Sequence, residues 1–224
     1  MYLETARTAP RQPFTMARFP EPHGDPEPAS VARGFTMSFS PDEEIFGDGE
    51  EADFAYQVVS GAARTFRLLC DGRRQVVGFH LPGETFGFER DLMHHLSAES
   101  VGPSEVRLIR RNALDAAAQS DVVVARWLWR QAAAELDRLH GHMLLLGRQS
   151  ASEKVGAFLL EMARRTVGAD SVVLPMTRMD IADYLGLALE TVSRTLAKFE
   201  REGAIAMPSC RRIQITNPAA LAIA

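Results

Sequence analysis

DIADYLGLALETVSRTLAKFEREG, residues 180–203, holds two short helical patterns on either side of Gly186. The first begins at Asp180, and Gly186 is typical of a residue that ends a helix. A second helix is expected over residues 188–200, with Gly203 just beyond its end. Two helices joined by a tight glycine-containing turn have the spacing of a helix-turn-helix, which places its second helix in the major groove of DNA.

The second of these helices has an apolar edge and a polar edge. The apolar edge carries Leu189, Val192, Leu196 and Phe199. The opposite edge presents Glu190, Ser193 and Arg194. A glutamate accepts a hydrogen bond from cytosine, an arginine binds guanine through two hydrogen bonds, and a serine contacts a base edge or a phosphate. Glu190 and Arg194 also stand at i and i+4, so the alternative is a weak surface ion pair. Their place at the start of the second helix favours base contact.

Residues 205–215, IAMPSCRRIQI, form two strand-like runs around a basic turn, which predicts a wing beside the helix-turn-helix. Donor and cationic side chains outside the reading edge are expected to contact phosphates, which positions a protein without reading sequence. The candidates are Thr191, Lys198, Arg211 and Arg212. Cys210 lies in the same turn. Thiols beside arginine are prone to oxidation, so redox control through Cys210 is a hypothesis, with an inert exposed thiol as the alternative.

A long helical pattern precedes this module, with apolar residues separated alternately by three and four positions. They are Val122, Ala125, Trp129, Ala132, Leu136, Leu139, Met143 and Leu146. So narrow a stripe is typical of a parallel dimer helix, whereas packing on its own domain is the alternative. The predicted dimer interface consists of Ala125, Trp129, Ala132, Leu136, Leu139 and Met143. Gly141 and Gly147 weaken the distal end of the stripe.

The N-terminal half has a different pattern. Short apolar runs alternate with glycine-centred turns over residues 35–110, and Asp71-Gly72 is a strong hairpin signal between two of them. These spacings predict a small sandwich or jelly roll and an α+β protein as a whole. We expect a flexible, proline-rich arm at 1–34, a jelly-roll domain at 35–120, a dimerisation helix at 121–147 and a winged helix-turn-helix at 148–224.

The composition is that of a globular chain, with 46% hydrophobic and 24% charged residues. No apolar run approaches the roughly 20 residues of a membrane helix, and the start lacks the apolar core of a secretory signal. A cytoplasmic protein without membrane contact is therefore expected. The net charge of −4 conceals an asymmetry, because 10 basic residues face 8 acidic ones from Arg148 onward and 15 face 21 before it. This balance permits a DNA-facing C-terminal half.

Three segments together resemble the CRP/FNR superfamily of bacterial transcription regulators, and within it the FixK branch. They read DGRRQVVGFHLPGETFGFE, LLGRQSASEKVGAFLLEMA and TRMDIADYLGLALETVSRTL, and the resemblance covers about residues 35–215. It implies a non-enzymatic homodimer, an activator that contacts RNA polymerase in microaerobic or nitrogen-related control. It also implies a TTGA-type palindromic operator with half-sites in successive major grooves. By similarity, Glu190, Ser193 and Arg194 match the base-reading residues of the family.

Departures from the family pattern argue against its usual cofactors. Cyclic-AMP-binding members use a Gly-Glu pair for the ribose and an Arg-Ser pair for the phosphate. Here Phe88 follows Gly87 and Leu96 precedes Ser97, and an apolar side chain cannot neutralise a phosphate. An FNR-type iron-sulfur cluster needs cysteines near the N-terminus, whereas no cysteine precedes Cys70. No cofactor is therefore expected, and Cys70, in an apolar run, is predicted to lie in the core.

His80, His94 and His95 are the candidate ligands for haem, and FHLPGE, which contains His80, resembles the first motif of cupin-type metal enzymes. His80, beside a Gly/Pro turn, is instead expected to be a hydrogen-bonded surface residue, and it does not supply the clustered ligands of a cupin. Two alternative functions stay open. One is a regulator gated by an unidentified small ligand in the jelly roll, and the other is a jelly-roll metal enzyme that ignores DNA.

Overall fold

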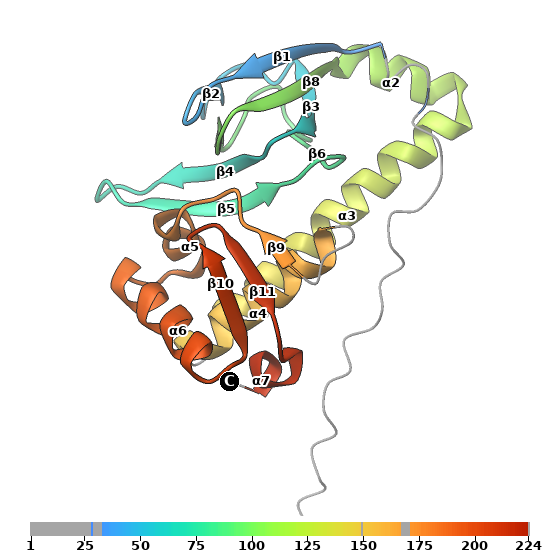
Figure 1. Cartoon of the computed structure of the whole chain (residues 1–224). Coiled ribbons are helices and arrows are strands. Elements are labelled where there is room, and N and C mark those ends of the chain that lie inside the picture. Colours follow the sequence, from blue (N-terminus) through green and yellow to red (C-terminus); the bar gives the residue numbers. More distant parts are fainter. Residues whose placement is uncertain (1–27, 29–32, 149, 167–170, 224) are drawn as a thin grey trace, which may run out of the picture.

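The computed structural model describes residues 28, 33–148, 150–166 and 171–223, so most of the predicted arm at 1–34 lies outside the described residues. The described chain has a β-rich N-terminal half, two consecutive helices and a mixed C-terminal half (Figure 1). The jelly roll, the long helix and the winged helix-turn-helix of the predicted α+β fold are all present. None of the helices in the described part of the chain is both long enough and apolar enough to cross a membrane.

The N-terminal half is a jelly roll of two four-stranded sheets, with strand orders β1-β8-β3-β6 and β2-β7-β4-β5. Its strands are β1 (Phe35–Phe39), β2 (Glu44–Phe46), β3 (Phe54–Ser60), β4 (Ala63–Leu68), β5 (Arg74–His80), β6 (Thr85–Phe86), β7 (Ser97–Ser100) and β8 (Ser104–Arg110). The predicted hairpin at Asp71-Gly72 is confirmed, because β4 and β5 pair in antiparallel register and Gly72 has φ 82°. Aromatic and aliphatic side chains from both sheets fill the interior.

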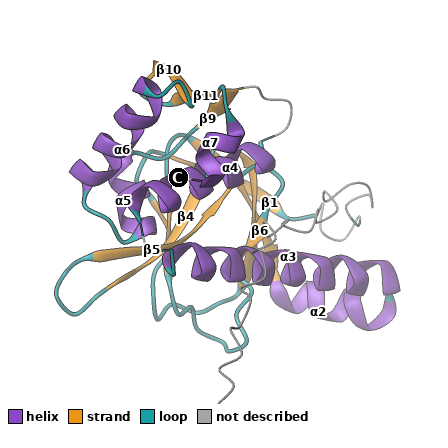
Figure 2. Cartoon of the chain, turned by 90° about the horizontal axis from the view of Figure 1, so that it is seen from below, coloured by secondary structure: helices purple, strands orange, loops and turns teal. Residues whose placement is uncertain are grey.

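Two helices follow the jelly roll, α2 (Arg111–Ser120) and α3 (Val122–Leu146). Asp121 separates them: its backbone N–H still donates to Ala117, while its side chain accepts from the backbone N–H of Val123 and so caps α3. α3 continues through Gly141 without a break. Figure 2 shows α3 as a straight rod with α2 beside its N-terminal end.

The two faces of α3 differ sharply. One face carries the buried residues Val124, Trp127, His142 and Leu145, which pack on this chain. The other carries the predicted dimer seam, of which Trp129 is 73% and Met143 63% exposed, while Ala132, Leu136 and Leu139 are also exposed and Ala125 is half-buried. Most of the predicted interface residues are therefore exposed on the subunit, and the dimer itself stays a prediction.

The C-terminal half contains α4 (Ala151–Arg165), β9 (Ser171–Val173), α5 (Arg178–Leu185), α6 (Leu189–Arg201), β10 (Ile205–Ser209), β11 (Arg212–Ile215) and α7 (Pro218–Ile223). The strands form a sheet of order β10-β11-β9, which makes the wing. The N-cap of α4 is Ser150. Ser150 and Glu153 form a reciprocal capping box, in which each side chain accepts from the other residue's backbone N–H.

The two halves share one hydrophobic core. It joins Phe79 of β5 to Phe158 of α4 and Tyr184 of α5, with ring centroids 6.3 and 5.1 Å from Phe79. His142 of α3 stacks on Tyr184 at 3.8 Å and donates from Nε2 to the Tyr184 carbonyl at 2.7 Å. The helix-turn-helix is therefore packed directly against the jelly roll and α3.

Candidate DNA-binding site

The first helix of the helix-turn-helix, α5, begins two residues earlier than predicted from the sequence. The prediction that it starts at Asp180 is wrong, because Thr177 is the N-cap and Asp180 is the third helical residue. The Thr177 hydroxyl accepts from the Asp180 backbone N–H at 3.1 Å, and Asp180 Oδ2 accepts from the Thr177 backbone N–H at 2.9 Å. This reciprocal pair satisfies two backbone donors and fixes where α5 begins.

The turn between α5 and α6 is set by Gly186, which ends α5 with φ 63°. A side chain is strained in this left-handed conformation, which explains the glycine. Ala188 then forms the N-cap of α6 without a side-chain hydrogen bond, and Gly203, with φ 71°, follows its C-terminal end. The predicted helix at 188–200 thus lies within one residue of the observed α6.

α6 packs with one edge and exposes the other. Val192, Leu196 and Phe199 are 0–2% exposed against the shared core, as their spacing predicted. Glu190 and Arg194 are exposed and Ser193 is half-buried. No ion pair joins Glu190 to Arg194 within the described residues, so the alternative reading of these two side chains as a surface pair is not seen. In both views α6 lies at the outer edge of the molecule (Figures 1 and 2).

The four predicted phosphate contacts lie around this edge. Lys198 is exposed on α6 with Nζ 4.0 Å from Glu202, and Thr191 is half-buried near the start of the same helix. Arg211 and Arg212 are exposed at the turn between β10 and β11, where the Ser209 hydroxyl accepts from the Arg212 backbone N–H. Cys210 is exposed in the same turn. α6 and the wing tip therefore present donor and cationic groups outside the core.

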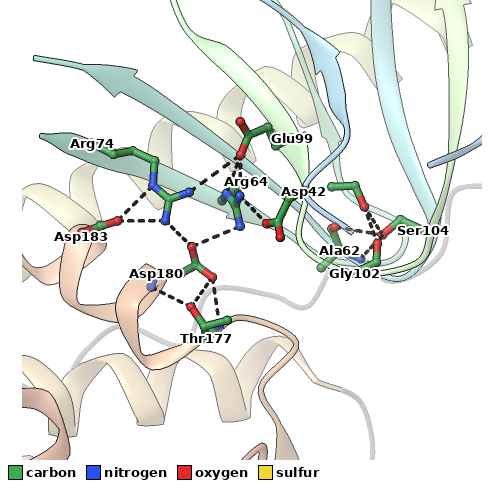
Figure 3. A network of polar contacts seen from close by, with 11 residues as sticks. Asp42, Ala62, Arg64, Arg74, Glu99, Gly102, Ser104, Thr177, Asp180 and Asp183 are labelled. Carbon is green, nitrogen blue, oxygen red and sulfur yellow. Dashed lines mark hydrogen bonds and ion pairs between the residues drawn. The ribbon is translucent and has the colours of Figure 1, made fainter. Parts of the chain in front are cut away.

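Behind α5 lies an ionic cluster that was not predicted from the sequence. It contains Arg64, Arg74, Asp42, Glu99, Asp180 and Asp183 (Figure 3). Arg64 and Asp180 are both nearly fully buried, although 116 residues separate them in the sequence. Burial opposes the charge on Arg64, but hydrogen bonds to Asp42 and Glu99 outweigh it and raise the pKa of the guanidinium. No pattern of neighbouring residues in the sequence predicts the contact between Arg64 and Asp180.

The prediction that His80 lies at the surface is wrong. His80 is fully buried rather than at the surface, because it ends β5 on the inward side, stacks on Phe86 at 4.4 Å and forms a hydrogen bond between Nε2 and Thr65 Oγ1. Burial lowers the pKa of His80 to about 3, so the imidazole is neutral at physiological pH. His94 is also buried, stacked on Phe46 at 3.7 Å, whereas His95 is exposed beside Asp91.

Phe88 and Leu96, which depart from the cyclic-nucleotide pattern, are both half-buried. Phe88 packs against a cluster that contains Leu114 and Trp127, and Leu96 is half-buried before β7.

The prediction that Cys70 lies in the core is wrong. β4 ends at Leu68, so Cys70 falls in the exposed turn of the hairpin.

Comparison with known proteins agrees with this architecture. A family model for a cyclic nucleotide-binding domain matches residues 36–121, and one for a Crp-like helix-turn-helix domain matches residues 153–223. The chain is 47% identical over 203 residues to the nitrogen fixation regulation protein FixK of Azorhizobium caulinodans, covering 87% of this chain and 81% of that relative. The corresponding FixK protein of Rhizobium meliloti is 42% identical over 200 residues, with 89% and 90% covered. The solved structure of FixK2 from Bradyrhizobium japonicum superposes with a TM-score of 0.80 at 49% identity, covering 84% of this chain and 95% of that one.

Proposed function

The chain belongs to the CRP/FNR family of DNA-binding transcription regulators, with FixK-like sequence, and we propose that it binds a TTGA-type palindrome as a homodimer. The observation that carries this proposal is the exposed polar edge of α6, whose Glu190 and Arg194 have no ion pair with each other in the described part of the chain. A carboxylate and a guanidinium that do not pair with each other are available to form hydrogen bonds with base edges.

In the proposed complex, α6 lies in the major groove. Glu190 accepts a hydrogen bond from a cytosine, Arg194 binds a guanine through O6 and N7, and Ser193 contacts a base edge or a phosphate. Thr191, Lys198, Arg211 and Arg212 contact phosphates and set the register of the module without reading sequence. The buried edge of α6 supports this assignment, because it fixes which side of the helix faces outward.

The proposed dimer forms along the seam of α3. Exposed apolar side chains on one stripe of a long helix are costly in water unless another surface covers them, and Trp129, Leu136 and Met143 form such a stripe. A second copy related by a twofold axis presents the identical stripe, as a parallel coiled coil requires. The same symmetry then gives two copies of α6 for the two halves of a palindrome.

We further propose that DNA binding requires neither a cyclic nucleotide nor an iron-sulfur cluster, and that the protein is an activator that contacts RNA polymerase in the cytoplasm. Phe88 and Leu96 replace the polar groups that a cyclic nucleotide needs, and the two cysteines of the chain are too few for the four ligands of the family cluster. A regulator gated by a small ligand in the jelly roll is the alternative, and it requires that ligand for tight binding.

The test is the affinity of the purified, ligand-free protein for a TTGA-type palindrome and for a scrambled duplex, at one fixed near-physiological salt concentration. We expect a preference of about a thousandfold or more. Equal affinity for the two duplexes would contradict the proposed operator, and a preference that appears only after a metabolite is added would favour the gated alternative.

A further inference from the structure

The ionic cluster joins the jelly roll to the first helix of the DNA-binding module. Arg74 of β5 donates from Nη2 to Asp180 Oδ1 at 2.6 Å and from Nε to Asp183 Oδ2 at 3.0 Å. Arg64 of β4 donates from Nη1 to the same Asp180 oxygen at 3.2 Å. Two strands of the jelly roll therefore hold one carboxylate of α5 from two directions (Figure 3).

Asp180 carries two structural tasks at once. Its Oδ2 atom belongs to the capping box with Thr177, while its Oδ1 atom accepts from both arginines. A shift of α5 relative to β4 and β5 must therefore break either the cap or the ion pairs. Because α5 packs against α6 through the shared core, the orientation of the recognition helix follows that of α5.

The cluster has two guanidinium groups for four carboxylates. On the jelly-roll side, Arg64 also bonds Asp42 at 2.7 Å and Glu99, so the acids of both halves are gathered around the same cations. Removal of one arginine leaves partly buried carboxylates of the two halves facing each other with half of the compensating charge. Like charges repel more strongly where they are partly buried than in water, so we expect the contact between β4, β5 and α5 to loosen at the cluster.

Other contacts hold the module elsewhere. Arg165 at the end of α4 pairs with Glu84 at 2.7 Å, and His142 binds the carbonyl of Tyr184 near the end of α5. Gln75 of β5 also donates from Nε2 to the Asp183 carbonyl of α5 at 2.8 Å. The cluster adds the ion pairs at the N-terminal end of α5. Without it, the remaining attachments still hold the module on the core but leave α5 free to tilt about them.

We propose that Arg64 and Arg74 are positioning residues that set the orientation of α6 in each subunit, and with it the spacing between half-sites that the dimer accepts. This inference rests on the homodimer and the palindrome proposed above. The jelly roll and α3 carry the twofold axis, and the cluster transmits their geometry to the helix that enters the groove. Arg64 and Arg74 touch no DNA and leave recognition of a single half-site unchanged.

The first test uses Arg74→Gln, because Arg74 is less buried than Arg64 and its loss is less damaging to folding. The matched control is Arg67→Gln, which removes the same charge from β4, one position from the residue that pairs with Arg74 in the sheet. Arg67 pairs with Asp48 inside the jelly roll. Both variants are titrated with duplexes whose half-sites are moved by one or two base pairs, and with a duplex that carries one half-site.

The wild type and Arg67→Gln are expected to bind one spacing best. If loss of the cluster leaves about a tenth of the molecules correctly oriented, Arg74→Gln binds that spacing about tenfold more weakly. It also loses its discrimination between spacings, while its affinity for one half-site stays the same. Arg74→Asp combined with Asp183→Arg exchanges the charges and is expected to restore the spacing preference that Arg74→Asp alone removes.

The second test does not depend on DNA. The two cysteines of the chain are both exposed, Cys70 on the β4–β5 hairpin and Cys210 in the wing, so spin labels on them report the distance between the two halves. Labelled chains are mixed with an excess of unlabelled Cys70→Ser/Cys210→Ser chains, so that distances within one subunit dominate. We expect one narrow distance distribution for the wild type and Arg67→Gln, and a broadened one for Arg74→Gln.

Identical spacing profiles and identical distance distributions for Arg74→Gln and Arg67→Gln would overturn the proposal. A wild type that binds the palindrome no better than a scrambled duplex contradicts the proposed operator instead. In that case the distance distributions alone decide whether the cluster orients the DNA-binding half.

Discussion

The polar edge of α6 and the ionic cluster behind α5 are both built from acidic and arginine side chains, but they use them in opposite ways. On α6, Glu190 and Arg194 are exposed and have no ion pair with each other among the described residues. In the cluster, Arg64 and Asp180 are buried and each has several partners. Exposed, unpaired charge is available to another molecule, whereas buried, paired charge holds the protein in one shape. The two regions thus divide recognition from positioning.

The largest expected effect comes from removing Arg64 from the ionic cluster. Arg64→Ala leaves Asp180 and Glu99 with one fewer cation, and we expect a loss of about 3–5 kcal/mol in the free energy of unfolding, measured with urea. Arg67→Ala, which removes a solvent-exposed pair with Asp48, is expected to cost at most about 1 kcal/mol. Equal losses for the two variants would mean that the buried cluster contributes no more than a surface pair.

The exposed seam of α3 gives the next largest effect. Leu136→Glu places two carboxylates across the proposed twofold axis, so we expect monomers in sedimentation and a loss of about a hundredfold in operator affinity, because the two half-sites are no longer bound together. Val123→Glu puts the same charge on an exposed position of α3 outside the seam and is the control. A Leu136→Glu protein that remains dimeric would place the dimer interface elsewhere.

On the reading edge the expected cost falls on binding alone. Arg194→Ala should lose about 1–3 kcal/mol of operator binding and relax the preference at one guanine, with the free energy of unfolding nearly unchanged. Arg201 is exposed at the far end of α6, so Arg201→Ala is the control and should leave that preference intact. Equal losses on operator and random DNA for Arg194→Ala would remove it from the reading set.

Buried His80 predicts how stability depends on pH. The pKa of His80 is lowered from 6.5 to about 3, so between these values the unfolded chain binds a proton that the folded chain does not. The free energy of unfolding therefore falls as the pH drops through this window, by at most about 1.4 kcal/mol per pH unit for this group. Urea titrations at several pH values between 7 and 5 give the free energy of unfolding as a function of pH. We expect this free energy to fall less steeply with decreasing pH in His80→Gln than in the wild type, and as steeply as in the wild type in the exposed control His95→Gln. An unchanged slope in His80→Gln would assign the pH dependence to other groups.

Lys198 gives the smallest effect. Lys198→Ala should weaken binding to all sequences alike and reduce the slope of log affinity against log salt concentration by about 2, because one phosphate contact is lost in each subunit of the dimer. Its exposed pair with Glu202, at 4.0 Å, adds little to stability. A loss confined to the operator would make Lys198 a base-reading residue instead.

Features that depend on neighbouring residues could be predicted from the sequence. The turn at Gly186, the buried edge of α6 and the hairpin at Asp71-Gly72 each follow from spacing and turn chemistry within a few residues, and all three are present. The heptad seam of α3 is exposed as a partner-seeking stripe should be, although its partner remains a prediction.

Features that depend on distant residues could not be predicted. Nothing near Arg64 or Asp180 in the sequence indicates that they meet, because their contact closes a separation of 116 residues. His80 was misplaced for the same reason, since the Gly/Pro turn beside it suggested a surface and only the packing of Phe86 shows that it is buried. The start of α5 was predicted two residues too late, because Thr177 and Asp180 are both residues that commonly cap a helix.

The most direct test of the division between the two regions is a crystal structure of the protein bound to a TTGA-type palindrome. We predict that the Arg194 guanidinium lies within hydrogen-bond distance of a guanine in each half-site, while Arg64 and Arg74 keep their contacts with Asp180. A complex in which Arg194 pairs with Glu190 and touches no base, or in which the Arg64–Asp180 contact is broken on the DNA, would contradict the account.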